Sequence, residues 1–502
     1  MTRSTKSMLG ALGLTLALLA PARTAHADDP AFVYTTRADP DYLRTAFEEL
    51  GIFGLGLLQY QSTKSNEQDW DVRVDWPGVR SKLLWEASSF DDNKFDTNWL
   101  THPAAGFLYY SAARGNRLGV LPSFAAAALA STAWEEIGEI REQVAINDVV
   151  VTPISALPLG ENALQLGAFL HRGRRTPMLV ALGWLLAPWK SAHDAIDGVT
   201  PEGAYVVDDL GLPADVWHRF TLGGSVGTTA QQRGTRQYDG RGFFGTDLVT
   251  VPGYRREGKR SVVFSSGEVT SMRFRIGASE DRLVDVLFNA STLPVGWFWQ
   301  DTHADVDGRL RGSETLAGLH VAAEYTLHDY DRDGRRAGDR LALVALGGTV
   351  EETVHLRGLT VSARLDILGD FAGVDAYALP EYQQARADQG LTSVLRKEHY
   401  YHALGGTVRP RLDLAYGSFD FGVDVRFDSF RAIANVNVDG PIENEVPAAD
   451  RRTSARAWFG VTPWKHLRFS LSGERNQRVG NIATVHAARR EAGVHLATEL
   501  VF

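Results

Sequence analysis

The chain contains no cysteine among its 502 residues, so disulfide bonds and thiolate chemistry are excluded. It also lacks a basic excess, because 52 Lys and Arg against 61 Asp and Glu give a net charge of -9, which argues against nucleic acid as a partner. After residue 27 it lacks the roughly 20 consecutive apolar residues of a transmembrane helix. A bacterial membrane β-barrel needs no such run, because its lipid-facing surface comes from alternating apolar and polar residues.

The first 27 residues have the pattern of a cleaved export signal. Arg3 and Lys6 precede a short apolar run at 9–20, and residues 25–27 (AHA) form an A-x-A cleavage site. We therefore expect the mature chain to start near Asp28 and to enter the periplasm of a Gram-negative envelope.

The second half of the chain, residues 205–502, alternates apolar and polar residues with a period of two. Leu359–Phe371 and Ser418–Asp428 show it most clearly, with polar residues, many of them charged, between the apolar ones. Such charges require water or a wet lumen on one face, while the apolar row can face lipid. Similar rows occur at 218–228, 242–252 (the weakest), 269–278, 282–292, 317–328, 339–350, 404–416, 453–462, 466–475 and 494–502. This pattern predicts an antiparallel transmembrane β-barrel of about 12 strands, within a range of 10–14. A soluble periplasmic β-sandwich is the alternative.

The last predicted strand, Val494–Phe502, ends in an aromatic residue, as the assembly signal of outer-membrane barrels does. We therefore expect the barrel-assembly machinery to bind this strand, and we expect localisation in the outer membrane in contact with its lipids. If the strand runs toward the periplasm, 371–397 and 432–450 are external loops. Residues 294–312 fit poorly, because they form a long connection where a short turn is expected. Trp297-Phe298-Trp299 within them is either an interfacial girdle or part of a missed strand.

Residues 28–204 place apolar residues in runs and at helical spacing, which predicts a small helical bundle. Candidate helices are Asp41–Leu58, Pro103–Arg114, Leu121–Gln143, Leu159–Leu170 and Pro177–Ala187. The fold class is therefore α+β, with a signal peptide at 1–27, a helical domain at 28–204 and a barrel at 205–502. We expect the bundle at the periplasmic mouth or partly in the lumen, and favour the mouth because a barrel this narrow has little room.

Polar residues gather on these helices. His102 precedes one helix, Glu135 and Glu139 share one side of another at i, i+4 spacing, and Asp148 follows. These four are candidate catalytic residues, since histidine with carboxylates can do acid–base chemistry or bind a divalent cation. The favoured interpretation is structural pairing, with Asp148 as an N-cap, because the spacing matches no zinc signature. The structural polar residues are Asn98, Arg114, Trp134, Asn147 and Glu161.

The polar residues form the series N-x3-HP-x2-G-x2-YY-x2-AR, S-x2-WE-x3-E, ND-x3-TP and GE. It is carried by Asn98, His102, Pro103, Gly106, Tyr109, Tyr110, Ala113, Arg114, Ser131, Trp134, Glu135, Glu139, Asn147, Asp148, Thr152, Pro153, Gly160 and Glu161. The series resembles an uncharacterised domain-of-unknown-function family of exported bacterial outer-membrane proteins, over about residues 90–200. The resemblance implies the location and the helix-plus-barrel layout, and no activity. The order His, Glu, Asp, Gly is also similar to VanZ-like and YfiM-like small helical membrane proteins.

A run of alternating acidic residues suggests a second site. Asp329, Asp331 and Asp333 precede Gly334 in a D-x-D-x-D-G pattern that can wrap Ca²⁺. The final Glu of an EF-hand is missing, and neighbouring arginines oppose a cation, so an external hairpin turn is the favoured interpretation. A divalent cation is the only cofactor class that the sequence suggests.

We expect an outer-membrane barrel of structural or transport type. The alternative is a lipid- or envelope-modifying enzyme that uses the His102–carboxylate cluster. Convergence of these side chains within hydrogen-bond reach, beside a lipid-accessible cleft, favours the enzyme.

Overall fold

The computed structural model describes residues 39–64, 72–200, 203–204, 206–231, 236–279, 283–332 and 335–502. The predicted export signal and mature start near Asp28 lie outside these residues.

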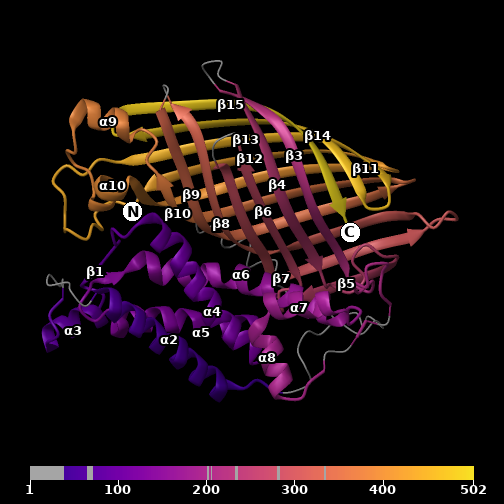
Figure 1. The fold of residues 1–502 in the computed structure, drawn as a ribbon, viewed down its shortest axis with the longest axis horizontal. Helices are drawn as coiled ribbons and strands as arrows, with labels where there is room; N and C mark the ends of the chain where they lie inside the picture. The colour runs from indigo at the N-terminus through magenta and orange to yellow at the C-terminus, as the bar shows by residue number, and fades with distance from the viewer. Residues whose placement is uncertain are drawn as a thin grey trace.

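Twelve antiparallel strands of the described chain close into a barrel (Figure 1). They are β3 (Trp217–Gln231), β4 (Arg236–Val249), β6 (Val269–Ala278), β7 (Leu283–Ala304), β8 (Leu310–Arg332), β9 (Arg335–Leu356), β10 (Leu359–Asp375), β11 (Tyr400–Tyr416), β12 (Phe419–Ala432), β13 (Ala448–Trp464), β14 (Leu467–Ile482) and β15 (Val485–Val501). β15 pairs with β3, which closes the ring. The predicted barrel is confirmed, and the soluble sandwich alternative is wrong.

Residues 294–312 correct the predicted strand boundaries. β7 continues to Ala304 and β8 begins at Leu310, so the connection is a short turn and Trp297-Phe298-Trp299 belongs to a strand. A further strand, β5 (Gly258–Phe264), pairs with this extension of β7. Phe298 is fully buried among Tyr254 and Leu316. Apolar residues therefore occupy both the inward and the outward face of β7 here, so the sequence does not alternate between apolar and polar residues.

The lumen is bridged by ion pairs. Asp339 of β9 accepts hydrogen bonds from Arg452 of β13 and Arg489 of β15, each at 3.1 Å. β9 and β15 lie on opposite sides of the ring. Glu324 of β8 similarly accepts a 2.7 Å bond from Arg426 of β12. Charged side chains from facing walls thus meet inside the barrel and leave no wide passage at these levels.

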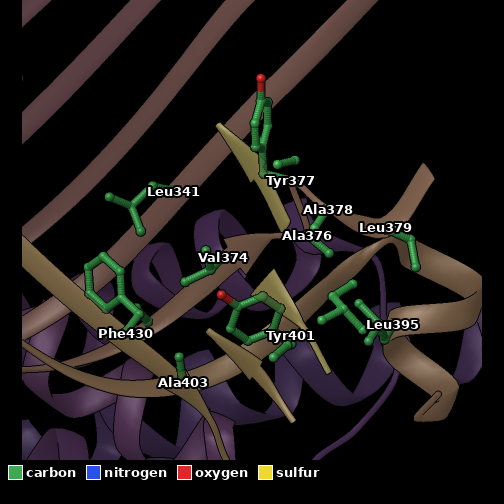
Figure 2. Packing of buried hydrophobic residues seen from close by; sticks show 14 of the residues in the cluster. Leu341, Val374, Ala376, Tyr377, Ala378, Leu379, Leu395, Tyr401, Ala403 and Phe430 are labelled. Carbon is green, nitrogen blue, oxygen red and sulfur yellow. The ribbon is translucent and has the colours of Figure 1, made fainter. Parts of the chain in front are cut away.

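One mouth of the barrel is also filled with apolar side chains. The β10–β11 connection contains α9 (Leu379–Arg386) and α10 (Ser393–Glu398). Their Leu379 and Leu395 belong to one buried cluster with Tyr377, Tyr401 and Phe430, and Figure 2 shows members of this cluster coming from the connecting segment and from the strands. This apolar plug joins the connecting segment to the inward faces of the strands.

The helical part precedes the barrel strands in the chain. It comprises α2 (Tyr42–Lys64), α3 (Trp76–Leu83), η1 (Thr97–Thr101), α4 (His102–Gly115), α5 (Val120–Ala133), η2 (Trp134–Gly138), α6 (Ile146–Arg172), α7 (Pro177–Leu186) and α8 (Pro188–Ile196), with the short paired strands β1 (Ser88–Ser89) and β2 (Val144–Ala145). The predicted helix over 121–143 is too long at its end, because α5 ends at Ala133 and continues only as the π-helical turn η2 to Gly138. α6 begins 13 residues before the predicted Leu159, despite Pro153 and Pro158 inside it. Its nearly complete burial outweighs the cost of interior prolines.

The helices lie against the outer wall of the barrel, along its length (Figure 1). α6 contacts β6, β7, β8 and β9, and Val321 of β8 packs with Tyr110, Ala156 and Leu157 of the helices. This corrects the predicted placement at the mouth or in the lumen, which ion pairs cross. Within the described residues, no helix is long and apolar enough to cross a membrane.

Candidate functional site

The polar residues of the helical part converge where η1, α4 and the first turn of α6 meet. His102 Nε2 lies 3.2 Å from Asp148 Oδ2. Asp148 is in the first turn of α6, where the helix dipole favours negative charge, but the N-cap position itself is occupied by Ala145. Burial raises the pKa of Asp148 well above its ordinary value and lowers the pKa of His102. Burial therefore disfavours the charged form of both side chains.

Asp91 is the hub of this cluster, and the sequence analysis missed it. Its Oδ1 accepts hydrogen bonds from Asn98 Nδ2 at 2.5 Å and from Asn147 Nδ2 at 3.0 Å. Its backbone N–H donates to Asn147 Oδ1 at 3.1 Å, and Asn147 Nδ2 also contacts Asp148 Oδ1 at 2.7 Å. Burial raises the pKa of Asp91 as well. An acidic run before a helix is too common a pattern to reveal such a role.

A tyrosine of the barrel completes the cluster. Asn98 Nδ2 donates to the hydroxyl oxygen of Tyr400, at the start of β11, at 2.9 Å. The Tyr400 hydroxyl donates in turn to the carbonyl oxygen of Asn93 at 2.9 Å. His402 Nε2 lies 3.3 Å from the carbonyl oxygen of Asp91. These contacts join the helical part to the wall, across 302 residues of sequence in the case of Asn98 and Tyr400.

The two predicted catalytic glutamates make other contacts. Glu135 Oε2 accepts a hydrogen bond from the backbone N–H of Ala145 at 2.8 Å, and Glu139 Oε1 accepts one from Trp134 Nε1 at 3.0 Å. Lys82 Nζ donates to the carbonyl oxygens of both glutamates, at 2.6 and 2.8 Å. Burial raises the pKa of Glu135 well above its ordinary value. The structure thus brings His102 to Asp148 and uses the glutamates to secure the turn that contains η2.

Arg114 and Glu161 form a separate, fully buried pair between α4 and α6. Glu161 accepts a hydrogen bond from Tyr110 Oη at 2.6 Å, two from the Arg114 guanidinium, and one from Gln165 Nε2 at 3.1 Å. Gly267 approaches the carboxylate so closely that a Cβ there would lie 2.5 Å from Oε2. The pair fixes the register of the two helices against the wall.

The proposed Ca²⁺ loop remains a prediction. Asp333 and the side chain of Asp331 lie outside the described residues, and Asp329 lies in β8. Elsewhere, among the residues that the structure describes, no group of three or more His, Asp or Glu side chains is arranged to hold a metal ion.

An apolar groove of about 370 Å³ runs between the helices and the barrel wall. On the helical side it is lined by Trp99, Leu100, Pro103, Ala104, Phe107, Ser155, Leu159, Asn162, Ala163, Leu166 and Leu186, and on the wall by residues including Met272, Phe288, Ala290, Ala323, Tyr325 and Val344. Leu100 and Pro103 flank His102 in the chain, so the helix turn that contains His102 forms one end of the groove, although neither His102 nor Asp148 lines it.

Comparison with known proteins adds a family for part of the chain. Residues 87–189 match the family described as a domain of unknown function, DUF3943, which supports the resemblance predicted over about 90–200. No curated protein matches the chain.

Several solved outer-membrane proteins show a distant structural likeness. A loop L8 deletion mutant of OmpT, an outer-membrane protein of Vibrio cholerae, is 4% identical, with a TM-score of 0.23, and the match covers 57% of this chain and 100% of that one. The outer-membrane channel DcaP of Acinetobacter baumannii is 10% identical, with a TM-score of 0.23 and coverage of 60% and 100%. The β domain of the Bordetella autotransporter BrkA is 13% identical, with a TM-score of 0.22 and coverage of 57% and 100%. The barrel of this chain is established by its own strand pairing.

Proposed function

We propose that this is an outer-membrane protein that works at the lipid-facing side of its barrel wall and does not conduct solutes through its lumen. The observation that carries the proposal is the polarity of helices α2, α5 and α7, which expose large apolar side chains and carry few or no charged residues on the same surface. Of the structural and transport types, this favours a membrane-embedded structural role.

Helix α2 shows this polarity most clearly. Glu48 accepts hydrogen bonds from Asn116 Nδ2 at 2.6 Å and lies 2.6 Å from His193 Nε2. Arg44, near the start of the helix, donates to Asp197 at 2.9 Å in an exposed pair. The large residues Tyr42, Leu43, Phe47, Leu50, Leu55 and Leu58 of the same helix are exposed, each by 64–70%. A water-soluble helix arranges these classes of residue in the opposite way.

Helices α5 and α7 extend the same apolar surface. Neither contains a charged residue, and Leu121, Leu129, Met178 and Leu185 are exposed on them. The outer faces of the neighbouring strands also expose apolar residues, including Ile367 of β10. Because the helices dock on the wall that would otherwise contact lipid, their apolar faces continue the lipid-facing belt of the barrel.

Cysteine labelling tests the embedding directly, since the chain has no cysteine of its own. Leu129→Cys carries a nitroxide label, and the protein is reconstituted in phosphatidylcholine vesicles. Leu412→Cys on β11 serves as the lipid-facing reference, and Val306→Cys in the β7–β8 turn as the aqueous one. We expect Leu129 to resemble Leu412, with high accessibility to oxygen and low accessibility to a water-soluble nickel complex. Accessibility like that of Val306 would overturn the embedding.

Conductance tests the closed lumen. The full chain in a planar bilayer should show no steady single-channel current, because ion pairs and the apolar plug bridge the barrel. A steady open-channel current would refute this half of the proposal and would favour transport.

A second candidate function, a lipid- or envelope-modifying enzyme, is favoured by one observation. His102 and Asp148 converge at 3.2 Å at the helix turn that also contributes Pro103 to the groove, and an imidazole paired with a carboxyl group can do acid–base chemistry. Lipid analysis of cells carrying His102→Ala should then match that of a deletion strain at normal barrel levels. His303→Ala, an exposed histidine of β7, is the matched control. Wild-type lipids in the His102→Ala strain would exclude catalysis by His102.

A further inference from the structure

We propose that the groove between the helices and the wall holds one acyl chain of a membrane lipid, with the polar end of the lipid toward the His102–Asp148 pair. This inference rests on the proposed function, because the groove must open to the bilayer. It names the class of ligand and the orientation in which that ligand binds.

The groove is built from surfaces that already suit lipid. Its floor is the outward face of β6, β7 and β8, where Met272 pairs in register with Ala290, and Ala290 with Ala323. At the next outward position, Phe288 pairs with Tyr325. The alanine pair leaves a hollow beside this bulky pair. The volume of about 370 Å³ and the apolar lining lie within the ordinary range of small-ligand sites.

The helices form the other two sides of the groove. Ala104 of α4 and Ala163 of α6 line it, and Ala104 is exposed at its rim. Small residues on both the floor and the sides keep the space open. An apolar space of this size that faces the membrane is filled most favourably by hydrocarbon, because water there would find few hydrogen-bond partners.

The two ends of the groove differ in polarity, which sets the orientation of the lipid. Trp99, Leu100 and Pro103 line the end that adjoins His102, where Asp148 lies seven residues before the lining residue Ser155 on α6. Leu166 and Leu186 line the other end. Ser155 and Leu166 are separated by about 16 Å along the helix. The first end is the more polar one, because the partly exposed side chain of His102 lies in the turn beside Pro103. We therefore place the polar headgroup at this end and the methyl end of the chain among the leucines at the second.

A photoreactive lipid tests both parts of the proposal. The full chain is reconstituted with a phosphatidylethanolamine that carries a diazirine at the methyl end of one acyl chain, irradiated, and digested for mass spectrometry. We expect crosslinks to concentrate in peptides that contain Leu166 and Leu186. Ala104→Phe and, from the opposite side, Ala163→Phe should each reduce this labelling at least fivefold. Ala457→Phe, on the outward face of β13, should leave it unchanged.

Three results would overturn the proposal. Equal groove labelling in the wild type and in both groove variants would show that no chain occupies the groove. Labelling spread evenly over the outer wall would show that the groove binds lipid no more specifically than the rest of the lipid-facing surface. Crosslinks concentrated at Trp99 and Leu100 would reverse the orientation. The nitroxide at Leu129 reports embedding independently of the groove, so failure of the lipid site and failure of the proposed function can be told apart.

Discussion

Replacing Glu161 by glutamine should loosen the helical part from the barrel wall. The carboxylate is fully buried and accepts bonds from Tyr110, Arg114 and Gln165. Glutamine has nearly the same shape but leaves the Arg114 guanidinium buried without its counter-charge. Removing one partner of a buried pair typically costs about 3–5 kcal/mol. Because α4 and α6 pack on each other around this pair, the substitution should lower the free energy needed to open the two helices together.

Hydrogen–deuterium exchange in detergent measures that opening. A loss of about 3 kcal/mol corresponds to more than about 100-fold faster exchange at the protected amides of α4 and α6. Strand amides on the far side of the barrel should be unaffected. Asp209→Asn removes a carboxylate from the exposed pair with Lys465 and should leave exchange unchanged. Wild-type exchange in Glu161→Gln would refute the reasoning, because the buried charge would then have another way to be stabilised.

Two further changes test the packing and the electrostatics of the helices. Gly106→Ala should destabilise the contact between α4 and α6 by about 1–3 kcal/mol in denaturant unfolding, because the new Cβ would lie 2.1 Å from the carbonyl oxygen of Thr152. Gly51→Ala on α2, where the same atom meets open space, should stabilise the protein slightly, and a loss equal to that of Gly106→Ala would contradict this reading. Burial raises the pKa of Glu49 from 4.5 to about 8, so the folded state holds a proton that the unfolded state releases, and stability should fall as pH rises from about 4.5 to 8. Glu49→Gln should remove that part of the pH dependence of the unfolding midpoint, and an unchanged slope between pH 5 and pH 8 would contradict the assignment.

The barrel was predictable because each strand faces two different environments. In β10, Leu365 and Ile367 are exposed on the outside while Asp366 and Asp370 are buried inside, so the sequence alternates. The end of β7 escaped prediction because Phe298 is buried in an apolar cluster on the face that elsewhere carries charge. Periodicity detects a strand only where its two faces differ.

Only those site residues that stand out from their immediate sequence neighbours could be predicted. His102, Asn98 and Asp148 stood out as polar residues beside apolar helices. Asp91 did not, because its contacts with Asn147 span 56 residues. The sequence pattern also could not predict that the helices dock on the outer wall of the barrel. Helix α2 contains both apolar and charged residues, and its sequence pattern is the same whether the charges face water or the protein interior. Only the residues that pair with those charges distinguish the two cases.

The exposed leucines of α2, α5 and α7 constrain the order in which the protein assembles. In water these apolar faces associate with one another and with any other apolar surface, whereas in a bilayer they are already surrounded by hydrocarbon and have no such tendency. The helices precede every barrel strand in the chain, so they are made before the wall on which they dock exists. If the chain is exported as its first 27 residues predict, it must cross an aqueous compartment with this surface folded against itself or held by a chaperone. Docking on β6–β9 then becomes one of the last steps, after the sheet has entered the membrane.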